Sequence, residues 1–223
     1  MIATVNVLTL DGPGGAGKGT VALRVADELG WHYLDSGALY RVLGLLACQQ
    51  DIPLDNEQKL AALARELNLV FEQGQAIVSG RNIDQLIRTE AAGDRASRLA
   101  SLPLVRAALL AWQRGCAKPP GLVADGRDMG TVVFPLACCK IFLTASAEAR
   151  AKRRFNQLRL KGFDVNIRQL FEQITERDQR DASRPVSPLK PADDAFILDT
   201  TDMTIDQVVA EVLVRAGAAL TGR

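Results

Sequence analysis

The sequence predicts an α/β fold, in which a five-stranded parallel sheet is flanked by helices. Short apolar runs alternate with longer stretches of helical periodicity, which is the pattern of strands joined by crossover helices. Strands of such a sheet are buried on both faces and therefore read as nearly continuous apolar segments. With 223 residues and 48% hydrophobic content, the chain is long enough for one well-packed domain, and we expect a single domain over residues 1–223.

Five short apolar segments are predicted to form the strands of the sheet. Val5–Leu10 is an apolar run that stops at Asp11 and a cluster of glycines, as a buried strand does where it enters a loop. The remaining sheet strands are predicted at Trp31–Leu34, Leu122–Ala124, Ile141–Leu143 and Phe196–Leu198. Helices are predicted at Lys18–Leu29, Ala38–Gln49 with Ser36 as its cap, Glu57–Glu66, Pro103–Ala117, Ala147–Leu160, Ile167–Asp181 and Ile205–Leu220.

Two segments interrupt the alternation of strands and helices. Leu69–Phe71 and Ala76–Val78 flank Gln73-Gly74-Gln75 and predict a small hairpin. We therefore expect an inserted substrate-binding subdomain over about residues 63–102. Leu160–Asn166 is irregular and contains Gly162, which indicates a short lid loop within a lid region of about residues 150–166.

Composition and charge narrow the classes of ligand. The formal net charge is +1, which gives no overall attraction to nucleic acid or membrane, yet residues 146–190 hold eleven Lys or Arg against six Asp or Glu. A basic region within a neutral chain suits a small anion. The spacing of the four cysteines matches no zinc site, and the single histidine, His32, leaves no material for a metal site built from histidines. With no targeting segment visible, we expect a cytoplasmic monomer that binds neither nucleic acid nor membrane.

A glycine-rich loop directly follows the first predicted strand and opens the first helix. Glycines let successive backbone amides curl around phosphate oxygens, the start of the helix adds partial positive charge, and Lys18 can reach the outer phosphates. This arrangement predicts a P-loop NTPase fold that binds ATP. The loop consists of Gly12, Pro13, Gly14, Gly15, Ala16, Gly17, Lys18, Gly19 and Thr20.

The loop departs from the common pattern at one position. The residue after Lys18 is Gly19, and the hydroxyl of Thr20 comes one place later than the hydroxyl that often ligates magnesium. We therefore expect no direct protein ligand, with Mg²⁺ held through phosphates and water. Asp125, which ends the predicted strand Leu122–Ala124, is the candidate carboxylate that organises the hydrated ion; a helix-capping role is its alternative.

At this point the chain resembles the bacterial cytidylate kinases. Gly-Lys-Gly-Thr is similar to the phosphate loop of nucleoside monophosphate kinases, and three longer blocks carry the resemblance across nearly the whole chain: residues 34–41, 124–135 and 176–181. The resemblance implies a P-loop kinase with an insert for the nucleoside monophosphate and a short lid. It also implies ATP as donor and CMP or dCMP as acceptor.

The resemblance implies roles for several charged residues. Arg41, Arg127 and Arg184 would clamp the acceptor phosphate, Arg177 would act in catalysis with them and with Lys18, and Asp181 would hold the ribose hydroxyls. By pattern alone, Arg177, Asp181 and Arg184 are explained equally well by a solvated, salt-bridged helix face. Two further positions are assigned to nucleotide binding: Ser36 to the acceptor, and Arg154 of the group Arg150, Arg153 and Arg154 to the ATP phosphates.

Recognition of the base requires groups that complement cytosine. Its amino group needs an acceptor, and its ring nitrogen or carbonyl needs a donor. Ser97 and Asp128 can accept, Arg106 can donate, and the family places its base-reading residues at positions that match these three. For Arg106 the alternative is the polar face of the helix that starts at Pro103.

Two other functions remain open at this stage. One is a P-loop kinase that acts on another nucleotide or on a hydroxylated metabolite. The other is a nucleotide-binding switch without catalysis, which often lacks the lysine of the phosphate loop or the arginine clamp. Transfer of phosphate to a panel of acceptors separates these readings.

Overall fold

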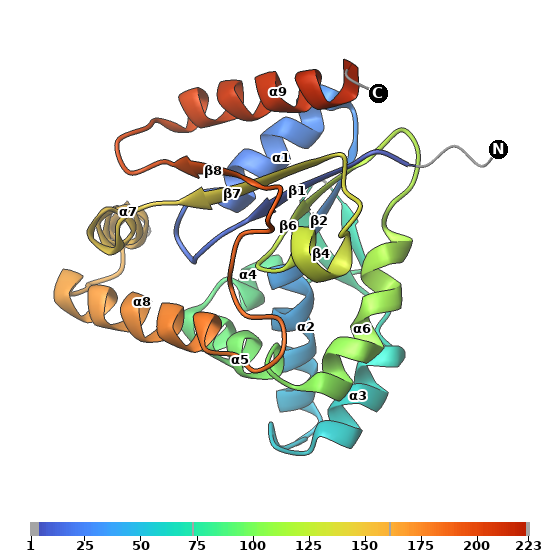
Figure 1. The fold of residues 1–223 in the computed structure, drawn as a ribbon. Helices are drawn as coiled ribbons and strands as arrows, with labels where there is room; N and C mark the ends of the chain where they lie inside the picture. The colour runs from blue at the N-terminus through green and yellow to red at the C-terminus, as the bar shows by residue number, and fades with distance from the viewer. Residues whose placement is uncertain (1–4, 73, 161, 222–223) are drawn as a thin grey trace.

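A computed structural model describes residues 5–72, 74–160 and 162–221 and confirms the five-stranded parallel sheet (Figure 1). The strand order is β2-β6-β1-β7-β8, and every neighbouring pair is parallel. Gln73 of the predicted turn and Lys161 of the predicted lid loop lie outside the described residues. The strands are β1 (Val7–Asp11), β2 (His32–Asp35), β6 (Leu122–Asp125), β7 (Cys139–Thr144) and β8 (Phe196–Asp199).

Two helices cover one face of this sheet. In Figure 1, α1 (Lys18–Leu29) and α9 (Ile205–Thr221) lie side by side above the strands. Their buried side chains share one apolar core with the strands, in which Leu8, Val21 and Val212 are fully buried. This packing fixes the start of α1 directly behind the loop that leaves β1.

The opposite side of the sheet carries a helical layer with its own apolar core. In this core α2 (Ser36–Gln49), α3 (Glu57–Arg65) and α6 (Pro103–Gly115) pack together with α5 (Glu90–Leu99). The predicted hairpin is confirmed as antiparallel β3 (Leu69–Glu72) and β4 (Gln75–Val78). The sequence did not predict three elements of this region: β5 (Arg81–Asn82), α4 (Asp84–Ile87) and α5.

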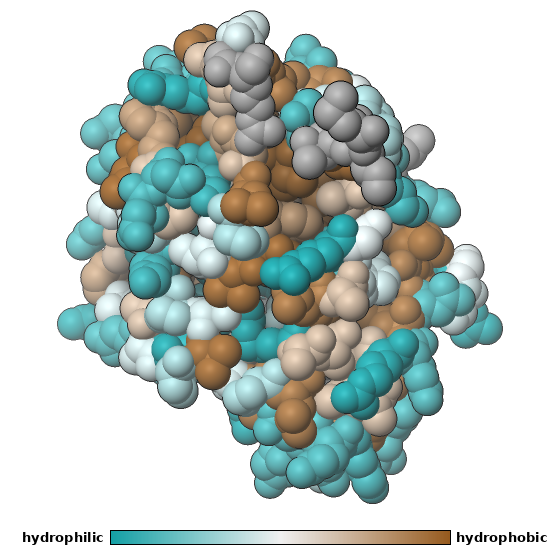
Figure 2. Space-filling view, turned by 45° about the vertical axis from the view of Figure 1, so that its right-hand side comes forward, coloured by the Kyte–Doolittle hydropathy of each residue, from teal (hydrophilic) through white to brown (hydrophobic). Residues whose placement is uncertain are grey.

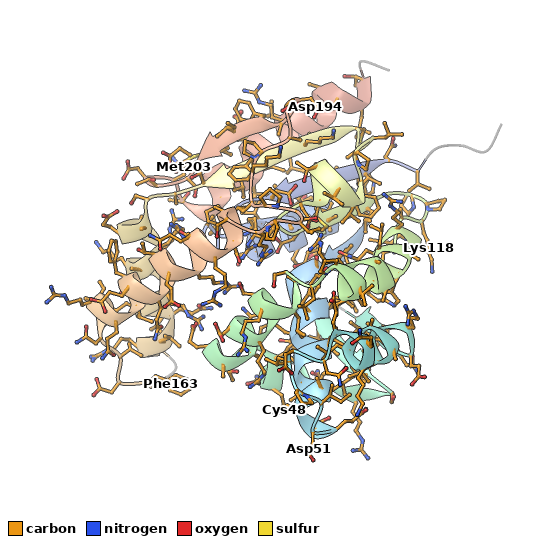
Figure 3. All side chains as sticks on the ribbon, turned by 60° about the horizontal axis from the view of Figure 1, so that its bottom comes forward. Cys48, Asp51, Lys118, Phe163, Asp194 and Met203 are labelled. Atoms are coloured by element: carbon orange, nitrogen blue, oxygen red, sulfur yellow. The ribbon has the colours of Figure 1, made fainter. Side chains whose placement is uncertain are left out.

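Two long helices stand beside the phosphate loop rather than on a sheet face. These are α7 (Ala147–Leu160) and α8 (Ile167–Ala182), which pack against each other. Much of the predicted lid region is therefore helical, because residues 150–160 belong to α7. Phe163 lies on the connection between α7 and α8, at the outer edge of the molecule, with 57% of its surface exposed (Figure 3).

One local prediction is wrong, and one short element was not predicted. Asp35, not Ser36, caps α2: its side chain accepts a hydrogen bond from the amide of Ala38 at 2.8 Å. A carboxylate one residue earlier reaches the free amides of the first turn equally well. The sequence also did not predict the π-helical turn η1 at Met129–Val133, which follows β6.

The surface that Figure 2 shows has no single dominant character. Figure 2 shows polar and apolar residues interspersed on one face. No helix in the described part of the chain has both the length and the apolar character needed to cross a bilayer. All four cysteines are free thiols, of which Cys139 is buried and Cys48 is exposed near the end of α2 (Figure 3).

Candidate active site

The predicted phosphate loop connects β1 to α1 and depends on its glycines. Gly12, Gly15 and Gly17 have φ values of +144°, +80° and +90°, in the region that side chains disfavour. A Cβ on Gly12 would lie 1.9 Å from the carbonyl oxygen of Leu143 in β7, so the chain can turn there only without a side chain. The cap position of α1 makes no side-chain hydrogen bond, which leaves its first amides available to an anion.

Lys18 lies at the start of α1 and is buried. Its amino group donates to the carbonyl oxygen of Pro13 at 2.9 Å, across the phosphate loop. Burial holds the pKa of Lys18 well below its usual value, and nearby Arg127 lowers it further. An anion bound in the loop would therefore favour the charged form of this lysine.

Three carboxylates end three adjacent strands beside the loop. Asp35, Asp125 and Asp11 close β2, β6 and β1, and all three are buried. Burial raises the pKa of Asp125, while Lys18 opposes this shift. A Cβ on Gly19 would lie 3.3 Å from Oδ2 of Asp125, which gives a spatial reason for glycine after Lys18.

Three guanidinium groups converge between the phosphate loop and α5. A Cβ on Gly14 would lie 3.6 Å from Nη2 of Arg127 and 3.8 Å from Nη1 of Arg177. A Cβ on Gly93 would lie 3.2 Å from Nη2 of Arg41 and 3.3 Å from Nη1 of Arg177. Burial, with Arg127 beside it, lowers the pKa of Arg177 to about 10. Like charges this close favour an anion between them.

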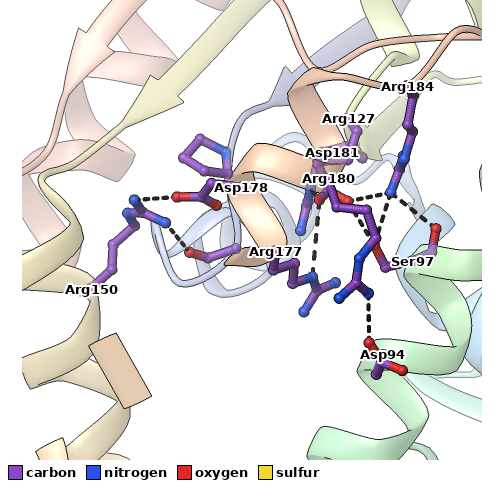
Figure 4. A network of polar contacts seen from close by, with 12 residues as sticks. Asp94, Ser97, Arg127, Arg150, Arg177, Asp178, Arg180, Asp181 and Arg184 are labelled. Atoms are coloured by element: carbon purple, nitrogen blue, oxygen red, sulfur yellow. Dashed lines mark hydrogen bonds and ion pairs between the residues drawn. The ribbon is translucent and has the colours of Figure 1, made fainter. Parts of the chain in front are cut away.

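Asp181 is the shared counter-charge of this basic cluster (Figure 4). It is 1% exposed and accepts hydrogen bonds from the hydroxyl of Ser97 at 2.8 Å and from Nε of Arg127 at 3.2 Å. Arg184 also donates to it, and Nε of Arg177 lies 4.0 Å away. In the predicted i, i+4 pair, Asp181 is therefore buried and Arg177 lines the cleft with 26% of its side chain exposed, so the pair is not on a solvated face.

A second buried polar group surrounds Arg106. Arg106 donates to the carboxylate of Asp128, to the hydroxyl of Tyr40 at 3.3 Å and to the carbonyl oxygen of Ala100 at 3.1 Å. Arg106 is 9% exposed, so it lies on the buried face of α6 and not on its polar face. Burial raises the pKa of Tyr40 to about 12, so its hydroxyl stays protonated near neutral pH.

A cleft of about 880 Å³ runs along the phosphate loop. Its lining includes the loop, the strand-end carboxylates Asp35 and Asp125, and the arginines Arg41, Arg127, Arg154 and Arg177. Ser97, Arg106, Asp128, Asp181 and Arg184 are buried behind this lining and do not belong to it.

Comparison with known proteins identifies the family of this chain. A family model described as cytidylate kinase matches residues 8–217. The chain belongs to the cytidylate kinase family. A cytidylate kinase of Colwellia psychrerythraea (strain 34H) is 55% identical over 220 residues, which cover 96% of this chain and 97% of that relative. A cytidylate kinase of Aeromonas salmonicida (strain A449) is 55% identical over 214 residues, which cover 94% of this chain and 93% of that relative.

Similarity to solved structures is weaker. A gluconokinase from Sinorhizobium meliloti 1021 aligns over 98% of this chain and 95% of its own length, at 16% identity and with a TM-score of 0.49. That likeness is too slight to add to the family assignment.

Within this cytidylate kinase family member, two predicted side chains, those of Arg184 and Ser36, lie differently from the expectation. Arg184 follows the end of α8 as expected, but its side chain is buried against Asp181 and Ser97 and does not point freely into a cleft. The hydroxyl of Ser36 donates to Oε1 of buried Gln113 at 3.0 Å. Their contacts with substrate remain predictions.

Two of the three arginines before the lid loop, Arg153 and Arg154, line the cleft, and Arg154 has the more exposed partner. Arg150 donates to the carbonyl oxygen of Gly14 at 3.1 Å and to Asp178 at 2.6 Å, so it supports the phosphate loop (Figure 4). Arg153 donates to the hydroxyl and carbonyl oxygens of Thr200. Arg154 lines the cleft and pairs with half-exposed Glu90 at 2.7 Å.

Sequence reasoning missed three side chains of the site. Tyr40 and Gln113 hold Arg106 and Ser36, and Arg88 donates to Asp35 at 2.8 Å while lining the cleft. The spacing of Arg106 and Gln113, seven residues apart on α6, places both on one helix face and was the one available signal.

Asp181 links stability to pH. Burial acts to raise the pKa of Asp181, but Arg127, Arg184 and Arg177 outweigh it and hold that pKa below its usual value. The carboxylate therefore stabilises the fold above the unfolded-state pKa of about 4, and the stabilisation is lost as the pH falls through the folded-state pKa. We expect Asp181→Asn to lower the free energy of unfolding at neutral pH by about 2–4 kcal/mol.

Urea denaturation of both proteins between about pH 7 and pH 3 measures this effect. The difference between Asp181→Asn and the unmodified protein should shrink as the solution becomes acidic. Asp206→Asn, which removes an 82% exposed partner of Arg24, is the control and should change stability little. A difference that stays constant over this range would refute the assignment of a depressed pKa to Asp181.

Proposed function

We propose that the chain transfers the γ-phosphoryl group of ATP to CMP or dCMP, which gives CDP or dCDP and ADP. One observation carries the proposal: Arg127 and Arg177 lie beside Gly14 of the phosphate loop, and Arg177 together with Arg41 lies beside Gly93 of α5. Two phosphates can therefore be held end to end, one by backbone amides and the other by guanidinium groups. Membership of the cytidylate kinase family supports cytosine nucleotides as the acceptors.

The donor side uses the phosphate loop and two cations. Backbone amides of Gly14–Thr20 and the ammonium of Lys18 would bind the β- and γ-phosphates. Arg154 would leave Glu90 and move to the donor phosphates, because both side chains line the cleft beside α5. We assign Lys18, Arg127, Arg177 and Arg184 to stabilising charge during transfer.

Magnesium fits this site as a hydrated ion. No group of three or more His, Cys, Asp or Glu side chains in the described ranges can hold a metal directly. The buried carboxylate of Asp125 lies beside Gly19 and Lys18, where it would accept hydrogen bonds from water bound to an ion on the phosphates. Bound Mg²⁺ supplies positive charge that offsets the charge of the phosphate oxygens.

Transfer between two phosphates needs positioning more than acid–base chemistry. The acceptor oxygen of a nucleoside monophosphate is already anionic near neutral pH, so no general base is required. The barrier falls because the arginines align the acceptor and offset charge that spreads over the moving group. The absence of a histidine from the lining of this cleft agrees with that chemistry.

The acceptor base would enter the pocket around Arg106. Arg106 is a donor, whereas Asp128 and Ser97 offer oxygen acceptors, and all three are buried. Such a set complements the amino group and ring acceptors of cytosine, and uracil would leave buried groups unpaired. Asp181, which the family resemblance assigns to the ribose, lies next to Ser97.

Binding requires parts of the molecule to move. The cleft does not reach Arg106 or Asp128, and α5 is tied to α8 and α7 by the ion pairs Arg180–Asp94 and Arg154–Glu90. We propose that the insert of residues 63–102 opens to admit the nucleotide and then closes with the lid of residues 150–166. Closure would exclude water and so suppress hydrolysis of ATP.

The acceptor panel tests the function. With ATP and Mg²⁺ in a coupled assay for ADP, we expect CMP and dCMP to give the highest kcat/KM, because uracil or adenine leaves Arg106 and Asp128 unpaired. UMP, AMP, GMP and a sugar alcohol are the comparison acceptors. A preference for any of these over both cytosine nucleotides would exclude the proposed function, and ATP binding without ADP formation would indicate a switch.

Arg184→Ala tests the acceptor clamp. We expect kcat/KM for CMP to fall on the order of 10²-fold or more, because an arginine is lost from the phosphoryl group, while ATP affinity changes little. Arg168→Ala, in α8 ahead of Arg184 and with 87% of its side chain exposed, is the matched control and should retain activity. A comparable loss of ATP affinity in equilibrium titration of Arg184→Ala would contradict the role.

Proton uptake tests Lys18. Because the pKa of Lys18 lies well below its usual value, the charge of bound ATP should raise that pKa, so ATP binding at about pH 8 takes up protons. Calorimetric titrations in EDTA, in two buffers of different ionisation enthalpy, measure the uptake. Lys18→Met should remove most of it. Equal heats in both buffers for the unmodified protein would show that Lys18 is already charged.

A further inference from the structure

Asp11 is a buried carboxylate that the proposed transfer does not use. It ends β1 immediately before the phosphate loop and is 6% exposed. Its Oδ1 accepts a hydrogen bond from the amide of Met129 and its Oδ2 from the amide of Gly130, both at 2.8 Å. One carboxylate therefore binds the first two amides of the turn η1, more than a hundred residues away in the chain.

Of these two amides, that of Gly130 is one that Asp128 would otherwise bind, because a cap residue accepts from the second or third amide of its helix. Asp128 precedes η1 in the cap position, and an aspartate there usually accepts from amides of its own turn. In this structure the Asp128 side chain makes no such hydrogen bond; it pairs with Arg106. Asp11 thus takes over the capping of η1 and leaves the Asp128 carboxylate paired with Arg106.

The surrounding atoms allow little freedom at this contact. A Cβ on Gly130 would lie 2.9 Å from the hydroxyl oxygen of Thr9 and 3.4 Å from Oδ2 of Asp11. The amide of Gly126 donates to the carbonyl oxygen of Leu10 at 3.0 Å, so the same loop is also held to the backbone of β1. The loop that carries Arg127 and Asp128 is therefore fixed to the strand that leads into the phosphate loop.

We propose that Asp11 is a positioning residue for acceptor selectivity, which acts by capping η1 so that Asp128 stays on Arg106 and available to cytosine. Asp11 touches neither nucleotide in this proposal. The inference rests on the proposed function, because it requires Asp128 to recognise the base.

Asp11→Asn tests the proposal with little change of shape. An asparagine offers one oxygen, and its amide group faces the second N–H donor, so one of the two hydrogen bonds is replaced by a repulsive contact. Asp128 should then turn to the amides of its own turn and withdraw from Arg106. We expect the ratio of kcat/KM for CMP to that for UMP to fall about tenfold or more, while the KM for ATP stays within about twofold.

A double-mutant cycle separates positioning from general support of the fold. Asp128→Ala should lower the same ratio, and Asp11→Asn should lower it no further in the Asp128→Ala background. A merely structural Asp11 would reduce kcat/KM for both nucleotides in parallel and leave the ratio unchanged. Asp194→Asn, whose carboxylate is 66% exposed beside Lys140, is the control and should keep the ratio of the unmodified enzyme.

The outcomes distinguish this inference from the proposed function. If the unmodified enzyme prefers CMP and Asp11→Asn keeps that preference, the inference alone is overturned; the same holds if the two substitutions act independently. If the unmodified enzyme shows no preference for cytosine nucleotides, both are overturned. Should Asp11→Asn fail to fold, Gly130→Ala displaces the same amide from Asp11, and an unchanged ratio in that variant overturns the inference.

Discussion

The active site depends on a single buried carboxylate that lets arginines gather around it. Arg127 comes from the loop after β6, and Arg177 and Arg184 come from α8 and the residue that follows its cap; Asp181 contacts all three. Unpaired guanidinium groups at this depth would lose hydration and repel one another. Asp181 lowers the free-energy cost of burying these guanidinium groups. It does not cancel their positive charge, because one carboxylate faces three cations. The remaining positive charge is what an acceptor phosphate would neutralise.

That imbalance explains why the site separates into two layers. The inner layer of Ser97, Asp181 and Arg184 is nearly satisfied by its own hydrogen bonds and is buried. The outer layer of Arg41 and Arg177 faces the cleft, and burial lowers the pKa of both. Groups whose charged form is disfavoured in isolation gain most from a bound anion. Burial also lowers the pKa of Arg184, so this arginine of the inner layer would attract the anion together with the outer layer, while Ser97 and Asp181 fix its position.

Features of the fold that depend on neighbouring residues could be predicted from the sequence, whereas features that depend on distant residues could not. The phosphate loop and all five strands of the main sheet could be predicted, because glycine spacing and apolar runs are contiguous in sequence. The short polar helices α4 and α5 could not, because tertiary packing rather than their own periodicity holds them in place. Partners such as Gln113 for Ser36 and Glu90 for Arg154 join distant segments, and no local pattern reveals them. The prediction of Ser36 as the cap of α2 was wrong because aspartate and serine cap helices equally well, and Asp35 precedes Ser36.

Three aspartates at one edge of the sheet each bind a different part of the site. Parallel strands end at the same edge, so Asp35, Asp125 and Asp11 lie close together although they are far apart in sequence. Each meets a different group: Asp35 caps α2 and binds Arg88 of the insert, Asp125 faces Lys18, and Asp11 caps η1. Since the strands are fixed by a common core, these three carboxylates place Arg88, the phosphate loop and the loop after β6 at one edge of the sheet. The proposed opening would move the insert relative to this edge and break the ion pairs of α5 with α7 and α8.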